Sequence, residues 1–392
     1  MKSYCICLLL FLLCIPSLSA QDSPFWNGLS SGKYAVGVRD TVLLNAGEVY
    51  KFRRYSGAKP FFVSIWYPAV DDPSKPYLKY DQYTAFNHSK DLHAIISALR
   101  YRYRKILIKD AVCKDIKEKE AIKYKPAQKK ILAEILAAPV NAKRNLLPVN
   151  VSLPLIFYHH GAQSSPFDNV LFCEYMASHG YTVISSNFLW PIDGKPHLGN
   201  SDQLNDIIFL LKHMKELSGF ETPDIIAAGH SWGGQALILY DTLKNKPFKK
   251  IIAFHTTLED KPVNQAIKMW PGLMAALQTK SDLMSTPTFL FAPQYRIKDG
   301  FDYLPYRENK ATPYTFITVN TDFISHDGFV LLGNLRTPFA DKYKLNDVAE
   351  LKTQDQFYKQ IILLSKSIIE DSITDKDQSL FSDKFTLQIV NR

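Results

Sequence analysis

The chain has 392 residues, of which 46% are apolar and 22% charged, so it is able to bury a large hydrophobic core. The formal net charge is +9, but residues 99–130 alone hold 12 Lys/Arg against 4 Asp/Glu, and the rest of the chain is close to neutral. No nucleic-acid-binding motif accompanies this charge, so binding of nucleic acid is not indicated. We expect a short leader, residues 1–20, followed by one large domain over residues 21–392.

Residues 1–20 have the pattern of a secretory signal peptide. Lys2 precedes an apolar run at residues 8–15, and Ser17 and Ser19 form a small-x-small cleavage signature. The apolar run is shorter than the roughly 20 residues that a membrane span requires. The pattern therefore predicts export to the periplasm or the extracellular space.

Cysteine usage is compatible with export. Beyond the leader the chain keeps Cys113 and Cys173. In an oxidising compartment these two are able to form a disulfide, and the alternative is a pair of buried free thiols. Neither cysteine belongs to a metal-binding pattern.

Strands and helices alternate along the chain. Apolar, β-branched and aromatic runs predict strands at residues 34–44, 61–67, 153–158, 181–186, 225–228, 250–254, 288–292 and 314–319. Helical spacing predicts helices at residues 168–179, 201–217, 265–279 and 354–369, with one more directly after Ser231. Strands separated by helices predict an α/β fold whose mainly parallel central sheet has helices on both faces.

An insertion at about residues 86–149 interrupts this alternation and is predicted to be mostly helical and basic. Within it, basic and apolar side chains interleave: Arg100, Arg102, Arg104 and Lys105 with Tyr101, Tyr103 and Ile106. One interpretation is a solvated helical face whose aromatic side packs inward. The other is a contact with an anionic surface, such as a membrane.

The motif that carries chemistry is Gly229-His230-Ser231-Trp232-Gly233, a G-x-S-x-G pattern between an apolar run and a helix. A serine at such a sharp turn has a strained backbone, and the glycines remove side chains that would clash across the turn. The turn exposes the hydroxyl at a helix N-terminus, which favours developing negative charge. The alternative is a helix-capping serine after a buried strand.

With this motif in place, the layout resembles the α/β-hydrolase fold of serine esterases. Four segments are similar to the platelet-activating-factor acetylhydrolase and dienelactone-hydrolase-like branch: residues 34–39 (YAVGVR), 63–68 (VSIWYP), 154–162 (PLIFYHHGA) and 229–234 (GHSWGG). The resemblance runs from about residue 32 to about residue 333 and omits the basic insertion. It implies a secreted carboxylic ester hydrolase, acetylhydrolase-like or lipase-like, that works through an acyl-enzyme without cofactor or metal. Peptide and thioester bonds are the alternative substrates.

The same resemblance assigns roles near Ser231. The amides of Ala162 and Trp232 would form the oxyanion hole, and the alternative for the first is a plain glycine turn beside a buried histidine. The chain order of this fold is serine, acid, histidine. His326 follows the last predicted strand of the resemblance, in Ser-His-Asp-Gly-Phe, and is the candidate base.

The acid is not fixed by the sequence. Simple alignment puts His255 where an aspartate is expected, and a histidine does not orient another imidazole as a carboxylate does. Glu259, a few residues later, is the first candidate, with Asp299 and Asp260 as alternatives. Each of the three is also explicable as a solvated loop carboxylate.

Two classes of function therefore stay open at this point. The first is a secreted serine esterase. The second is a non-catalytic protein that uses the same fold as a binding surface, which the displaced acid and the basic insertion suggest. The natural substrate, acyl length and oligomeric state are not encoded in any pattern of the sequence.

Overall fold

The computed structural model describes residues 23–86, 90–112, 126–149, 154–162, 164–188, 201–219, 224–241, 248–258, 263–279, 286–293, 314–321, 324–372 and 385–390. The leader predicted at residues 1–20 lies outside them. No helix among these residues has both the length and the apolar character that a membrane crossing needs.

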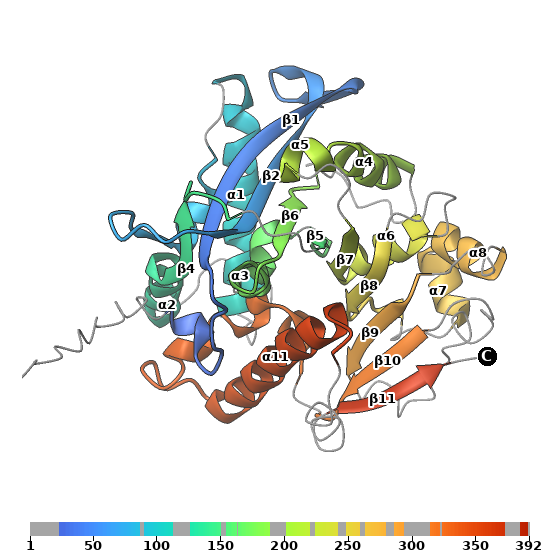
Figure 1. The fold of residues 1–392 in the computed structure, drawn as a ribbon. Coiled ribbons are helices and arrows are strands. Elements are labelled where there is room, and N and C mark those ends of the chain that lie inside the picture. The colour runs from blue at the N-terminus through green and yellow to red at the C-terminus, as the bar shows by residue number, and fades with distance from the viewer. Residues whose placement is uncertain are drawn as a thin grey trace, which may run out of the picture.

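An 11-stranded sheet runs through the described residues in the order β11-β10-β9-β8-β7-β5-β6-β2-β1-β4-β3 (Figure 1). The strands are β1 (Ala35–Phe52), β2 (Tyr55–Ala69), β3 (Tyr77–Lys79), β4 (Pro139–Arg144), β5 (Leu155–His159), β6 (Thr182–Ser186), β7 (Ile225–His230), β8 (Phe248–Phe254), β9 (Thr288–Pro293), β10 (Tyr314–Val319) and β11 (Phe385–Val390).

The centre of the sheet is parallel, as predicted. Strands β6, β5, β7, β8, β9 and β10 pair in parallel. The short apolar runs that form β5 and β7 are buried along their whole length, which is typical of strands covered on both faces. Antiparallel strands extend both sides: β2 on β6, β1 on β2, and β11 on β10. Strands β3, β4 and β11 were not among the predicted strands.

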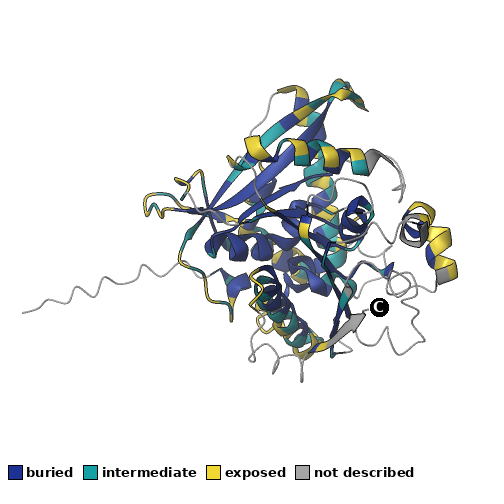
Figure 2. Ribbon diagram, turned by 45° about the vertical axis from the view of Figure 1, so that its right-hand side comes forward, coloured by how far each residue is buried: buried dark blue, intermediate teal, exposed yellow. Residues whose placement is uncertain are grey.

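Helices cover both faces of the sheet, which confirms the predicted layering (Figures 1 and 2). Neighbouring residues of β5 show this, because Ile156 belongs to one core cluster and Phe157 to the other. The first cluster includes residues of α1 (His93–Ile106), α2 (Pro126–Ala137), α3 (Val170–Ser178) and α11 (Val348–Ile369). The second includes residues of α4 (Ser201–Lys212), α5 (Met214–Ser218), α6 (Trp232–Asp241), α7 (Val263–Met269) and α8 (Pro271–Thr279).

Two predicted helices are each divided into two. The helix expected at residues 201–217 is interrupted at His213, between α4 and α5. The helix expected at residues 265–279 is interrupted at Trp270, because Pro271 has no amide hydrogen and disfavours the helical conformation of the residue before it.

The insertion is not only helical, which corrects the prediction for residues 86–149. It contains α1 and α2, but its last part is strand β4, which pairs in parallel with β1 through Val36, Gly37 and Val38. Val140, Ala142 and Lys143 are buried along β4, so its residues do not alternate strictly between inside and outside. So short a segment is not distinguished from a loop in the sequence.

The basic part of the insertion is partly neutralised and partly packed. Arg100 and Arg104 on α1 both lie within salt-bridge distance of Asp81, at 3.4 and 3.2 Å. Tyr103 is buried in the core, whereas Tyr101 is 63% exposed. One side of α1 therefore packs inward, and residues 113–125 of the basic segment lie outside the described residues. A contact with an anionic surface stays a prediction.

Cys173 on α3 is a buried free thiol, and burial holds its pKa well above the usual range for a thiol. Cys113 lies outside the described residues. Of the two alternatives for Cys173, the structure has the free thiol and not the disulfide.

Glu174 ties three peripheral segments to α3. Its buried carboxylate accepts hydrogen bonds from Trp26 Nε1 at 2.9 Å, from the Tyr83 hydroxyl at 2.5 Å and from the Asn141 amide at 3.2 Å. These donors come from the N-terminal 3-10 turn (Pro24–Trp26), the 3-10 turn before the insertion (Tyr80–Thr84) and β4. A single side chain thus joins the start of the domain and both ends of the insertion to the core.

We expect Glu174→Gln to lower the free energy of unfolding by about 1–3 kcal/mol, because the amide nitrogen of glutamine cannot accept and leaves a buried donor unpaired. Urea denaturation monitored by tryptophan fluorescence measures the change. Glu370→Gln is the matched control, since Glu370 pairs with Lys366 at the surface of α11, where such pairs contribute less than about 1 kcal/mol. Equal midpoints for the two variants would contradict the role given to Glu174.

Candidate active site

Ser231 lies in the sharp turn between β7 and α6. Its φ is +53°, a left-handed conformation that non-glycine residues adopt only under strain. The neighbouring glycines leave no room for side chains: a Cβ at Gly233 would lie 2.2 Å from the carbonyl oxygen of His159, and one at Gly229 would lie 2.7 Å from the Gly234 nitrogen. The Ser231 amide donates to the Phe254 carbonyl at 2.9 Å, which anchors the turn to β8. The sequence pattern thus produces the turn that it predicts.

His326 reaches Ser231 from the other side of the site. It begins the 3-10 turn His326–Phe329, a few residues after β10. Its Nε2 lies 3.0 Å from the Ser231 hydroxyl oxygen. This distance lets the imidazole accept the hydroxyl proton, as nucleophile activation requires. The structure therefore brings together these two predicted residues, 95 positions apart.

His255 lies against the far side of the His326 ring. The two Nδ1 atoms are 2.9 Å apart. His255 directly follows β8, its amide donates to the Phe291 carbonyl of β9 at 2.9 Å, and the residue is 1% exposed. Its φ of +48° is again left-handed. The sequence placed His255 at this strand end but gave it no role.

The sequence offers three candidate acids. Glu259, Asp260 and Asp299 all lie outside the described residues. Their assignment stays a prediction.

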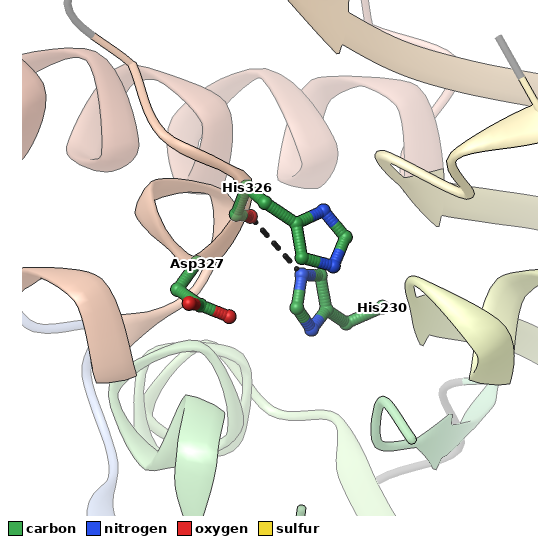
Figure 3. A group of neighbouring side chains, drawn as sticks. All are labelled: His230, His326 and Asp327. Carbon is green, nitrogen blue, oxygen red and sulfur yellow. Dashed lines mark hydrogen bonds between the residues drawn. The ribbon is translucent and has the colours of Figure 1, made fainter. Parts of the chain in front are cut away.

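His230 makes a hydrogen bond to the backbone of His326. Its Nε2 donates to the His326 carbonyl oxygen at 3.2 Å, and the two rings lie 4.7 Å apart (Figure 3). Burial lowers the pKa of His230 to about 3, so the ring is neutral near pH 7. The sequence offered no signal for this role, since His230 occupies the variable position of the motif.

One group of described side chains at this site offers ligand atoms for a metal ion. Among the described residues, His230, His326 and Asp327 offer ligand atoms that lie within 4.8 Å of one another (Figure 3). Both ring nitrogens of His326 already contact other side chains, Ser231 and His255. A metal bound through His326 would have to break one of these contacts, so the geometry favours proton transfer over metal ligation at this ring.

Gln354 of α11 holds the loop that carries His326. Its side-chain oxygen accepts from the Ser325 amide at 2.9 Å and from the Ser325 hydroxyl at 2.8 Å, and its side-chain nitrogen donates to the Gly333 carbonyl at 2.9 Å. The contact joins residues 29 positions apart, so no local sequence pattern announces it.

The loop after β5 lies beside Ser231. A Cβ added at Gly161 would lie 3.4 Å from the Ser231 Cβ, and the following residue, Ala162, is exposed. His160 fixes this loop: its Nδ1 donates to the Gly161 carbonyl at 2.7 Å, while its Nε2 accepts from the Phe188 amide at 3.3 Å. Burial lowers the pKa of His160 to about 4, which keeps this arrangement neutral.

Trp232, the other predicted oxyanion residue, is the first residue of α6. The first amides of a helix have no acceptor within the helix and point out of its N-terminal end. Ala162 lies in the loop after β5, and Trp232 directly follows Ser231. Their role as hydrogen-bond donors stays a prediction.

We expect the stability of the protein to carry a pH dependence that comes from His230. The pKa of His230 is about 3 in the folded state and about 6.5 when unperturbed. Between pH 3 and pH 6.5, therefore, the histidine is protonated in the unfolded chain but not in the folded chain. This contribution is complete above about pH 6.5 and is lost as the pH falls, by up to about 1.4 kcal/mol per pH unit. His230→Gln keeps a donor for the His326 carbonyl but does not titrate.

Urea denaturation between pH 5 and 8 tests this expectation. The parent should lose stability relative to His230→Gln as the pH falls below about 6.5, and the difference should be constant above about pH 7. His93→Gln, at an exposed position of α1, controls for the substitution itself. A parent-to-variant difference that does not change with pH would contradict the neutral, buried state of His230.

No protein-family model and no curated protein matches this sequence. Among solved structures, the chain is similar to a ferulic acid esterase from Streptomyces cinnamoneus, with a TM-score of 0.51 at 14% sequence identity, over 86% of this chain and 91% of the other. The fold is α/β-hydrolase-like. The sheet has 11 strands among the described residues, which is more than the eight usual for this fold. The three that the sequence did not predict are β3, β4 and β11. At this identity the likeness concerns the fold alone.

The narrower resemblance, to the platelet-activating-factor acetylhydrolase and dienelactone-hydrolase-like branch, is not supported by this neighbour. What the comparison bears out is the α/β-hydrolase-like architecture on which that resemblance was built. The site itself lies where such a fold places one, at the carboxyl ends of parallel strands. Ser231 directly follows β7, and His255 directly follows β8. The loop of Gly161 comes shortly after β5.

Proposed function

We propose that this protein is a serine hydrolase that cleaves carboxylic esters through an acyl-enzyme, with Ser231 as nucleophile and His326 as base. The observation that carries the proposal is the 3.0 Å contact between the Ser231 hydroxyl and His326 Nε2, made at a strained strand-to-helix turn. A strained backbone at a polar residue is a feature of functional sites. The similar solved structure is named as an esterase, which agrees with this reaction class.

The reaction follows from the positions of these atoms. The Ser231 oxygen bonds to the acyl carbon while its proton moves to His326 Nε2, and the carbonyl π electrons move onto the oxygen. When the tetrahedral intermediate collapses, the alcohol leaves with the proton from His326. Water then repeats the sequence on the acyl-enzyme, which releases the acid and restores Ser231. No cofactor enters either half of the reaction.

Ala162 and Trp232 are the proposed oxyanion donors. The first belongs to the loop after β5, whose Gly161 lies close to the Ser231 side chain, and the second is the first residue of α6. Each such donor typically stabilises the transition state by about 3 kcal/mol.

For the substrate we propose a small-molecule or lipid ester, in line with an acetylhydrolase-like or lipase-like activity. The leader pattern at residues 1–20 supports export, so the substrate would be met outside the cytoplasm. A peptide or a thioester remains the alternative acyl donor.

A fluorophosphonate probe tests the reaction class directly, because it phosphonylates only an activated serine. We expect labelling of Ser231, located by peptide mass spectrometry, together with hydrolysis of p-nitrophenyl acetate. Esters of increasing acyl length, a peptide anilide and a thioester then define the substrate class. An unlabelled protein without activity on any of these would favour the non-catalytic binding function instead.

A further inference from the structure

His255 takes the place that a carboxylate normally has in a serine-hydrolase triad. Resting on the proposed function, we propose that His255 is the positioning residue for His326, so that the site works as a Ser231–His326–His255 array. The 2.9 Å separation of the two Nδ1 atoms is a hydrogen-bond distance, and it lies on the opposite side of the His326 ring from Ser231.

The roles of the ring nitrogens fix the tautomers. For His326 to take the Ser231 proton, its Nε2 must carry the lone pair, and its hydrogen is then on Nδ1. That hydrogen points at His255 Nδ1, which accepts it only when His255 is neutral with its own hydrogen on Nε2. His255 thereby selects the productive tautomer of His326, which is the principal task of the triad acid.

The backbone around His255 is built for this placement. His255 and Thr257 both have positive φ, +48° and +65°, in the loop directly after β8. The Phe291 carbonyl holds the His255 amide, and the Phe329 ring, 5.0 Å away, packs on the imidazole. Two left-handed non-glycine residues in so short a stretch are costly unless function or packing requires them.

A neutral partner changes the electrostatics of the site. During the reaction His326 becomes an imidazolium, which a carboxylate would stabilise by charge, whereas His255 stabilises it only through the hydrogen bond. Four other ionisable groups lie nearby among the described residues: His230 at the end of β7, with His160 beyond it, and Asp327 beside His326, with Asp168 beyond it. Asp327 belongs to the same turn as His326.

Substitutions at position 255 separate positioning from packing. His255→Phe keeps a ring against Phe329 but removes the acceptor, and we expect kcat to fall roughly 100-fold with little change in KM. His255→Asp supplies a charged acceptor and should retain or exceed the parent kcat. With the carboxylate next to the imidazolium, it should also move the acidic limb of the kcat/KM profile to higher pH. His255→Gln, a neutral acceptor, should lie between the two.

A purely structural role predicts the reverse order, because phenylalanine suits a buried position and an aspartate does not. Parent-like kcat in His255→Phe with loss of activity in His255→Asp would overturn the proposal. Urea midpoints for all three variants identify any that fail to fold.

Glu259→Gln, Asp260→Asn and Asp299→Asn test the alternative that a carboxylate orients His326. A collapse in one of them beside a parent-like His255→Phe would assign the acid to that carboxylate and overturn the proposal. If the parent itself neither hydrolyses esters nor reacts with the fluorophosphonate, the proposed function fails.

A spectroscopic measurement does not depend on activity. In protein labelled with 15N-histidine, the Nδ1 hydrogen of His326 should give a downfield proton resonance coupled to nitrogens of two different rings. This double coupling should vanish in His255→Phe, whereas a carboxylate partner would never produce it. Its absence from the folded parent would contradict the hydrogen bond between the two rings.

Discussion

Ser231→Ala should lower kcat for ester hydrolysis by at least about 10⁴-fold, because it removes the hydroxyl that lies 3.0 Å from His326 Nε2. The residual rate should come from the oxyanion donors and from substrate binding alone. The variant should bind substrate with a similar KM and should not react with the fluorophosphonate. Steady-state hydrolysis of p-nitrophenyl acetate, with intact-mass analysis after labelling, measures both effects.

The alanine at this position should not unfold the protein. It keeps the left-handed backbone of the turn, as the serine does, and removes only the hydroxyl. Ser74→Ala is a suitable control, since Ser74 lies at an exposed turn where its hydroxyl contacts Asp72. Parent-rate hydrolysis by purified Ser231→Ala would mean that the site chemistry is assigned to the wrong residue.

His326→Ala should lower kcat nearly as much as Ser231→Ala does, because an unassisted serine hydroxyl is a weak nucleophile near neutral pH. Since the two residues act as one unit, the double variant Ser231→Ala/His326→Ala should be hardly slower than either single variant. For each of the three variants, kcat is measured with one substrate at one pH and divided by the parent kcat. The logarithms of these three ratios show whether the losses of the single variants add up in the double variant.

His93→Ala is the matched control for a histidine lost from the exposed surface of α1. Fully additive losses in the double variant would show that Ser231 and His326 act independently. That result would break the mechanism even if each single variant were impaired.

The parts of the fold that are encoded locally were predictable. The fully apolar runs of β5 and β7 and the glycines around Ser231 leave few alternatives, because a buried parallel strand and a sharp turn each demand those residue types. His326 followed from the order of elements, and its contact with Ser231 is as expected. These predictions needed only neighbouring residues or the chain order of one fold.

The parts that depend on distant contacts were not predictable. Strand β4 is recognisable by its pairing with β1, more than 100 residues earlier in the chain, and with β3, about 60 residues earlier. Gln354 and Glu174 likewise gain their roles from partners far away in the sequence. The sequence puts His255 at the end of β8, where its residue type alone argues against the role of a triad acid. A histidine is a poor substitute for a carboxylate in general, yet its geometry here fits the imidazole that it faces.

The pairing of β4 with β1 has a consequence for protein engineering. An insertion that loops out of a domain can be excised and its ends rejoined, but this one supplies a strand to the sheet. Cutting out residues 86–149 would leave the edge of β1 at Val36 and Val38 without a partner, and would uncover the apolar surface that Val140 and Ala142 protect. An unprotected strand edge of this kind templates association between chains. A minimal version of the protein should therefore retain β4.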